Sequence, residues 1–266
     1  MVEILGYILA VVVGVTLGLT GGGGSILTVP VLVYLLGTSP MLATAYSLFI
    51  VGTSSLIGAI SFMKQKQVHY KSALIFGAPA LIAVYVTRKF IMPIVPETII
   101  TSSSFTLSKD VFIMIFFSII MVIAAFSMIK RKKKTNDNQV REITYNYPMI
   151  LTEGAIVGVI TGFIGAGGGF LIIPALVVFA KMPMKLAIGT SLLIIAIKSL
   201  IGFIGDLTEQ TIEWGFLLIF TGFTVTGIFI GIALNKKISS QNLKIGFGWF
   251  VLIMGIFIII KEVIIN

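Results

Sequence analysis

The chain of 266 residues is 57% hydrophobic and only 11% charged, a balance that excludes an ordinary water-soluble domain. It has no cysteine and one histidine, which excludes disulfides, thiolate metal sites and cysteine nucleophiles and argues against a zinc site. The net charge of +9 comes from basic clusters between apolar segments, where it orients membrane helices and does not indicate a nucleic-acid surface. Composition therefore predicts an all-α polytopic membrane protein in a lipid bilayer, with no cofactor and no metal.

Ten apolar segments follow one another along the chain, and two of them are too short to span a bilayer. They cover Val2–Leu19, Ile26–Leu36, Met41–Met63, Ser72–Ile91, Val111–Ile129, Pro148–Ile164, Phe170–Ala180, Lys185–Ile204, Trp214–Leu234 and Leu243–Ile260. Ile26–Leu36 and Phe170–Ala180 supply about 16 Å of helix each, whereas the hydrocarbon core is about 30 Å thick. We therefore predict about eight full transmembrane helices plus two short broken or re-entrant half-helices.

Charged residues between the segments predict the orientation in the cell (plasma or inner) membrane. The loop Lys130–Arg141 is the most basic and is expected in the cytoplasm, together with the cluster Lys64–Lys71. The loop Gly205–Glu213 has three acidic residues and no basic one, so it is expected outside. These signs place both termini outside. Arg88 and Lys89 are the one basic pair that does not fit this orientation, because they fall at an end of a segment that is expected outside.

An internal repeat relates the two halves of the chain. Residues 14–60 align with residues 158–204 at a constant shift of 144 positions without a gap, and roughly 20 of the 47 positions are identical. Chance at this composition would give about four. The loop after the first copy is basic and that after the second is acidic, which indicates opposite orientation. We predict two inverted repeats, residues 1–129 and 147–266, joined by a basic cytoplasmic linker at 130–146.

The core of the repeat is a glycine-rich turn followed by a proline, GLTGGGGSILTVP in the first copy and GFIGAGGGFLIIP in the second. A helix broken where its backbone has no water must line a cavity or be buried in protein. The short helix after each turn begins with unpaired N–H groups, and two such ends together favour a small anion. Close packing of small residues is the alternative. The predicted substrate-binding residues are Gly21, Gly22, Gly23, Gly24, Ser25, Gly165, Ala166, Gly167, Gly168 and Gly169, with Pro30 and Pro174 as hinges or helix breaks.

Hydroxyl side chains gather in the helix after each short segment. The duplicated pair Ser47 and Ser191 is assigned to the substrate site, because a hydroxyl can donate to an oxyanion. For the other hydroxyl residues, such as Thr44 and Ser55, a structural role is an equally good explanation: the side chain would bond to a carbonyl of its own helix or to a neighbouring helix.

Three ionisable residues are candidates for function. Lys198 lies inside an apolar helix, where an anionic substrate would supply the partner that a buried ammonium needs; the alternatives are that it snorkels outward or pairs with Asp206. Glu153 lies near the end of its segment, where it would be an interfacial carboxylate or would carry a coupling proton. His69 lies in a basic loop and is expected to be solvated.

At the paired glycine motifs the chain resembles the TauE/SafE family of membrane permeases, the sulfite exporters. The resemblance covers almost the whole chain, including GTSPMLATAYSLFIVGTSSLIGAI, KMPMKLAIGTSLLIIAIKSLIGFI and the later GFTVTGIFIGIALNKKIS. It implies export or uptake of small sulfur-containing or organic anions such as sulfite, sulfoacetate or thiosulfate. Four consecutive glycines in the first turn, and Lys198, depart from the family's pattern.

The predicted function is that of a secondary transporter, not an enzyme. No nucleophile, base and acid fall within one site, and no nucleotide motif is present, so the driving force is expected to be the substrate gradient, the membrane potential or a proton. The small anion would bind near the midplane between the two half-helix starts and be exposed alternately to the two sides. An anion channel of the same architecture is the alternative.

Overall fold

The computed structural model of the chain describes residues 2–102, 105–129, 147–164, 168–178, 182–207, 211–237 and 239–262. The predicted linker at 130–146 and the turn residues Gly165, Ala166 and Gly167 lie outside the described residues. Nearly all of the described chain is helical, so the predicted all-α class is confirmed.

The element order follows the apolar segments closely. The first half contains α1 (Val2–Thr20), α2 (Ser25–Pro30), the π-helix η1 (Val31–Leu35), α3 (Pro40–Lys64), α4 (Tyr70–Val86), the π-helix η2 (Thr87–Ile91), α5 (Met92–Ile94), β1 (Thr98–Ser102), β2 (Phe105–Ser108) and α6 (Lys109–Ile129). The second half contains α7 (Tyr147–Ile164), α8 (Gly169–Val178), α9 (Met184–Asp206), α10 (Trp214–Asn235) and α11 (Ser240–Ile260).

Several of these helices are suited to a bilayer. Within the described residues, four helical stretches are long and apolar enough to cross a membrane: α3, Tyr70–Ile94, α9 and α10. Shorter apolar helices cover Ile4–Thr20, Ser25–Leu35, Leu151–Ile164 and Gly248–Ile260. Because many large apolar side chains on the outer faces are exposed, the molecule presents the surface that a multi-pass membrane protein shows to lipid.

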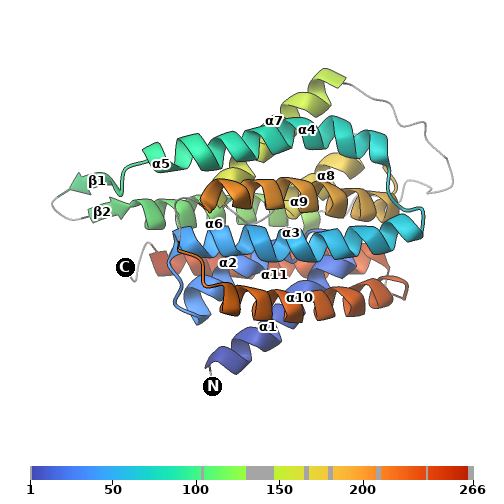
Figure 1. Ribbon diagram of the computed structural model, residues 1–266, viewed down its shortest axis with the longest axis horizontal. Coiled ribbons are helices and arrows are strands. Elements are labelled where there is room, and N and C mark those ends of the chain that lie inside the picture. The colour runs from blue at the N-terminus through green and yellow to red at the C-terminus, as the bar shows by residue number, and fades with distance from the viewer. Residues whose placement is uncertain are drawn as a thin grey trace.

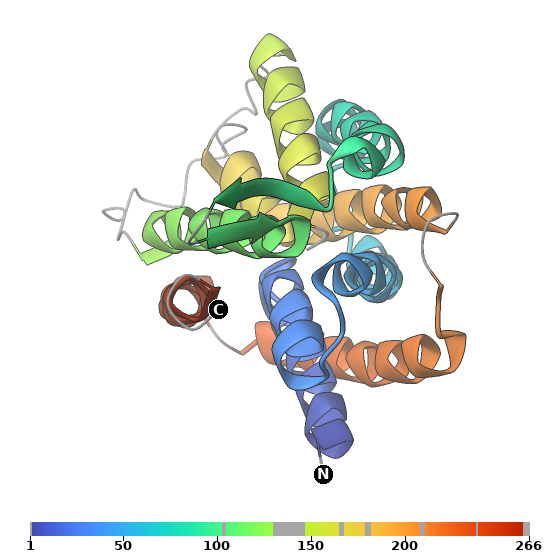
Figure 2. The same cartoon turned by 90° about the vertical axis from the view of Figure 1, so that its left-hand side faces the viewer.

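Helices of the first half pack mainly against helices of the second (Figures 1 and 2). α1 runs against α10 and α4 against α7, while α3 packs on α9 and α6 on α11. Figure 2 shows α1 and α7 on opposite sides of the molecule, one at the bottom and one at the top. Each half therefore buries its apolar faces against the other half.

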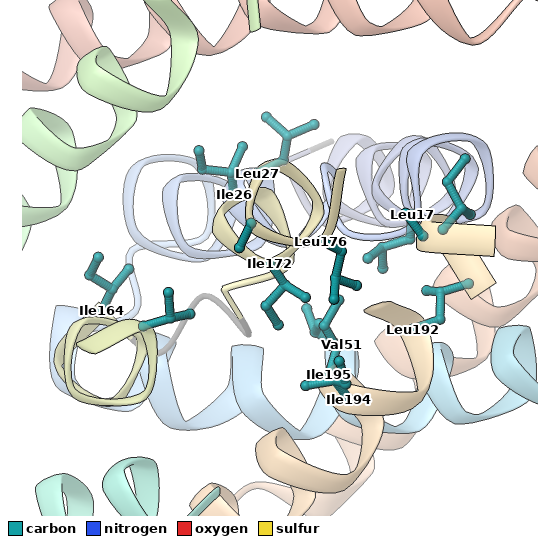
Figure 3. Packing of buried hydrophobic residues seen from close by; sticks show 14 of the residues in the cluster. Leu17, Ile26, Leu27, Val51, Ile164, Ile172, Leu176, Leu192, Ile194 and Ile195 are labelled. Carbon is teal, nitrogen blue, oxygen red and sulfur yellow. The ribbon is translucent and has the colours of Figure 1, made fainter. Parts of the chain in front are cut away.

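The short helices lie at the centre of the molecule. Every residue of α2 is buried, and its Ile26 belongs to one core cluster with Ile172 and Leu176 of α8. Val51 of α3 and Ile195 of α9 join the same cluster, as Figure 3 shows. The two glycine-led helices are thus enclosed by the pair α3 and α9.

Small residues bring the backbones of α1 and α10 into contact. A Cβ on Gly14 would meet the carbonyl oxygen of Thr224, and a Cβ on Gly227 would meet that of Val11. Gly18 and Gly231 make the same kind of approach one turn further along. This is the small-xxx-small contact that brings membrane helices together, because lipid provides no hydrophobic drive between them.

Replacing Gly227 by alanine should therefore destabilise the protein. The added methyl group has to push the backbone of α1 away, and overpacking of this kind costs about 1–3 kcal/mol. Gly222 of the same helix has open space around it, so Gly222→Ala is the matched control and should leave the unfolding midpoint unchanged or slightly raised. Thermal unfolding in detergent measures both. Equal midpoints for the two variants would contradict the close contact of α1 and α10.

One element was not expected from the sequence. Strands β1 and β2 form an antiparallel hairpin between α5 and α6, in a stretch that lies between two of the predicted apolar segments. Its sequence is rich in isoleucine, threonine and serine, which favours extended backbone over helix. The helices on either side of the hairpin are joined by Lys109 of α6, whose Nζ donates to the carbonyl of Met92 in α5 at 2.7 Å.

Candidate functional site

The first glycine turn is buried and satisfies much of its own hydrogen bonding. Gly21 has a φ of +73°, a left-handed conformation that favours glycine, and its N–H donates to Leu17 O. The N–H of Gly23 donates to Thr20 Oγ1 at 2.8 Å. Ser25 Oγ donates to the carbonyl of Gly22 at 2.6 Å. The break in the helix is therefore enclosed by protein, as a bilayer requires.

The second turn is described from Gly168 onward. Gly168 has a φ of +64°, and its carbonyl accepts from the N–H groups of Leu171 and Ile172 at the start of α8. The side chain of Pro174, the predicted hinge, lies outside what the structure describes, whereas Pro30 is buried at the junction of α2 with η1. The π-helical turn η1 follows this proline directly.

The structure brings the two turns into direct contact. A Cβ on Gly22 would lie 2.5 Å from Gly169 Cα, and a Cβ on Gly169 would meet Gly22 in the same way. Ser191, on α9, donates from Oγ to the carbonyl of Gly21 at 2.6 Å and to that of Ile188 at 2.9 Å. Gly21, Gly22, Gly169 and Ser191 therefore lie together, as the repeat predicted, and Gly24 faces α1 instead.

Lys198 points into the protein beside the second turn. Its side chain is buried, and Nζ donates to Thr161 Oγ1 at 2.8 Å. A Cβ on Gly168 would lie 2.7 Å from Nζ. No carboxylate of the described residues lies within 4 Å of this ammonium. Neither alternative from the sequence holds, because Lys198 does not snorkel outward and Asp206 pairs elsewhere.

Buried hydroxyl groups occur on both α3 and α9, two helices that pack against each other. Ser47, Ser54, Ser55 and Ser199 are buried, and their Oγ atoms have no hydrogen-bond partner within the described part of the chain. Ser47 thus differs from its repeat counterpart Ser191. Unpartnered buried hydroxyls are uncommon and mark places where a ligand or water would be stabilised.

A buried ion pair that was not predicted from the sequence joins the two halves of the chain. Arg88, in η2, donates from Nη1 to Asp206 Oδ2 at 3.1 Å and to Thr44 Oγ1 at 3.0 Å. Both charged side chains are almost completely buried. Arg88 is therefore not an external loop charge, which explains why it disagreed with the charge pattern. This misfit with the charge pattern was the one feature of the sequence that indicated an unusual role for Arg88.

The two other ionisable candidates are His69 and Glu153. His69 is half-buried: its side chain accepts from the N–H of Ser72 at the start of α4, and its backbone N–H donates to Thr190 Oγ1 at 2.9 Å. Glu153 is half-buried on α7. The described residues contain no cluster of three or more histidine, aspartate or glutamate side chains that could hold a metal ion.

The sequence of the chain matches one family model over nearly its whole length. Residues 6–258 match the model described as "Sulfite exporter TauE/SafE". The chain belongs to the TauE/SafE family. The resemblance seen in the glycine motifs is thereby confirmed over nearly the full length of this multi-pass membrane protein.

Curated relatives carry names of the same kind. The chain is 29% identical to a "Probable membrane transporter protein" of Xylella fastidiosa (strain 9a5c), covering 93% of this chain and 91% of the relative. It is 27% identical to "Probable membrane transporter protein YunE" of Bacillus subtilis (strain 168), covering 90% and 92%. A probable membrane transporter protein of Methanocaldococcus jannaschii is 26% identical, covering 95% and 94%. No solved structure matches the chain significantly.

Proposed function

We propose that this TauE/SafE protein is a secondary transporter of small sulfur-containing or organic anions. The observation that carries the proposal is Lys198, a buried lysine beside a glycine turn whose one hydrogen-bond partner within the described residues is the neutral hydroxyl of Thr161. A charge in a bilayer protein is costly and is retained where it contacts a substrate or ion pathway. An anion would complete its hydrogen bonding and neutralise it.

The binding site, in this proposal, lies between the two glycine turns and α9. Lys198 supplies the charge, Ser47 and Ser191 supply hydroxyls, and the turn residues supply backbone N–H groups. In the structure the turns touch at Gly22 and Gly169, and several turn groups bond within the turn. We interpret this arrangement as a closed state, in which an entering anion separates the turns and replaces these bonds.

Alternating access would come from two inverted repeats, residues 1–129 and 147–266, with eight full helices and two half-helices. The helix pairs support this view. In the repeat, α1 would correspond to α7 and α4 to α10. The contact between α1 and α10 would then have the contact between α7 and α4 as its counterpart, and the structure contains both contacts. The pairs α3 with α9 and α6 with α11 likewise map onto themselves. A pseudo-two-fold axis between the halves would produce this pattern.

The family description and the site chemistry together favour sulfite, sulfoacetate and thiosulfate as substrates. A proton is our candidate for the coupling ion, with Glu153 as one carboxylate that could carry it. We also retain the orientation in which the loop Lys130–Arg141 is cytoplasmic and both termini are external.

Transport by purified protein in liposomes tests the function. We expect saturable uptake of at least one of sulfite, sulfoacetate and thiosulfate, stimulated when the same anion is preloaded inside. Exchange stimulation requires a carrier, because a channel has no reorienting step. Conductance without saturation would identify an anion channel. Flux equal to that of empty liposomes for all three anions would contradict the proposal.

A further inference from the structure

The π-helical turn η2 holds an arginine, Arg88, inside the protein. A Cβ on Gly162 of α7 would lie 2.7 Å from Thr87, and one on Gly205 of α9 would lie 3.2 Å from Cβ of Arg88. The Arg88 side chain is 0% exposed. Along α9, Asp206 is eight residues from Lys198, about 12 Å of helix. The guanidinium of Arg88 thus has other partners, Asp206 and Thr44, than the amine of Lys198, which bonds Thr161.

Arg88 uses only one of its three nitrogens. Nη1 binds both Asp206 and Thr44, whereas Nε and Nη2 have no hydrogen-bond partner among the described residues. These two adjacent nitrogens form one edge of the guanidinium fork, the arrangement that holds two oxygens of a carboxylate, sulfonate or phosphate group at once. Thr87 Oγ1, on the neighbouring residue, is buried and unpartnered as well.

Such an edge is unfavourable when it stays empty. Removing a charged group from water costs free energy that a single ionic contact does not repay, and each unpaired buried donor adds to the cost. Asp206 does not resolve this, because its contact is with Nη1. The edge and the hydroxyl of Thr87 are together a set of donors without an acceptor.

We propose that the Nε–Nη2 edge of Arg88 is a second anion-binding site, which takes a small oxyanion with two oxygens, such as a sulfonate or carboxylate, assisted by the hydroxyl of Thr87. Asp206 competes electrostatically with this anion for Arg88, which keeps binding weak enough for exchange. That this site lies on the transport pathway rests on the proposed transport function. The binding of an anion to it does not depend on that function.

The test uses the full-length protein in maltoside detergent freed of phospholipid, with methanesulfonate as the probe and chloride to balance ionic strength. The background variant is Lys198→Met, which removes the charge at the glycine turns. Calorimetric titration should still detect methanesulfonate. Adding Arg88→Lys should weaken binding about tenfold, because an ammonium has no fork, and adding Asp206→Asn should tighten it by a similar factor. Thr87→Val should weaken it less.

The matched control is Lys89→Gln, which removes an exposed positive charge from the neighbouring residue and should leave the affinity unchanged. A purely structural ion pair predicts that Arg88→Lys and Asp206→Asn lower the unfolding midpoint while methanesulfonate affinity stays the same, and this result would overturn the proposal. So would absence of methanesulfonate binding in the Lys198→Met background. Should Arg88→Lys fail to fold, unchanged affinity in both Asp206→Asn and Thr87→Val overturns it.

The two proposals fail separately. If liposomes containing the wild-type protein move no anion but the titrations respond to Arg88 and Asp206, the transport function is wrong and the binding site stands. If transport occurs and methanesulfonate affinity is unchanged by the substitutions at Arg88 and Asp206, the proposal of a second site is wrong and the transport function stands. Binding seen only when phospholipid is restored would assign the oxyanion to a lipid headgroup, and this outcome would overturn a site for soluble anions.

Discussion

Lys198→Met is expected to abolish most anion transport while making the protein more stable. Loss of one partner from a buried, hydrogen-bonded charge pair costs about 2–5 kcal/mol, so anion affinity should fall at least about 30-fold. Without substrate, however, the amine of Lys198 is buried, and its one hydrogen-bond partner in the described part of the chain is a hydroxyl. Replacing it by an apolar side chain of similar length should raise the free energy of unfolding by about 1 kcal/mol or more.

The opposite signs of the two effects make this prediction specific. Thr161, which loses its donor, keeps its hydrogen bond to the carbonyl of Gly158, so no new unpaired group is created. Concentration-dependent uptake in liposomes measures the first effect, and thermal unfolding in substrate-free detergent measures the second. Lys89→Met, at an exposed position, is the control and should change neither. If Lys198→Met lowered stability and left uptake intact, Lys198 would be a structural residue.

Gly168→Ala should be a strongly damaging change at the second glycine turn. Its φ of +64° is a left-handed conformation that costs alanine about 1–2 kcal/mol. The new methyl group would also collide with Thr161 Cγ2 and lie 2.7 Å from Lys198 Nζ. Overpacking adds about 1–3 kcal/mol, and it displaces the ammonium that the anion needs. We expect reduced stability together with a loss of transport.

Gly37→Ala separates the cost of the left-handed backbone conformation from the cost of overpacking. Gly37 has nearly the same backbone conformation, with a φ of +69°, but a Cβ there would have nothing within 4 Å. This variant should show the backbone cost alone and transport at the wild-type rate. Thermal unfolding and uptake measured side by side compare the two. Equal effects of Gly168→Ala and Gly37→Ala on both readouts would show that the space beside Lys198 has no role.

Much of the fold was predictable because the bilayer leaves few choices. Apolar runs interrupted by glycine and charge determine where helices begin and end, so α3, α9 and α10 lie close to their expected ranges. The glycine turns were recognisable because they recur at a fixed spacing. The hairpin of β1 and β2 was not, since nine strand residues between helices carry little periodic signal.

The contact of the two glycine turns was predictable from the sequence, but the hydrogen-bond partners of the side chains around them were not. The duplication indicated that the two glycine turns meet, and they do so at Gly22 and Gly169. It did not indicate that Ser191 would bind the first turn while Ser47 has no partner among the described residues. Identical residues at repeated positions acquire different neighbours, because the partner helices are not themselves identical.

By itself, then, the sequence determined the membrane environment, the helical class, the family and the scarcity of charge in the interior, since these follow from composition and spacing along one chain. Only the tertiary structure decided which charges lie inside. Lys198 turns toward Thr161, and Arg88 reaches Asp206 across more than a hundred residues of sequence. Lysine and arginine side chains are long enough to reach either lipid headgroups or the protein interior, and the choice depends on the helices packed around them.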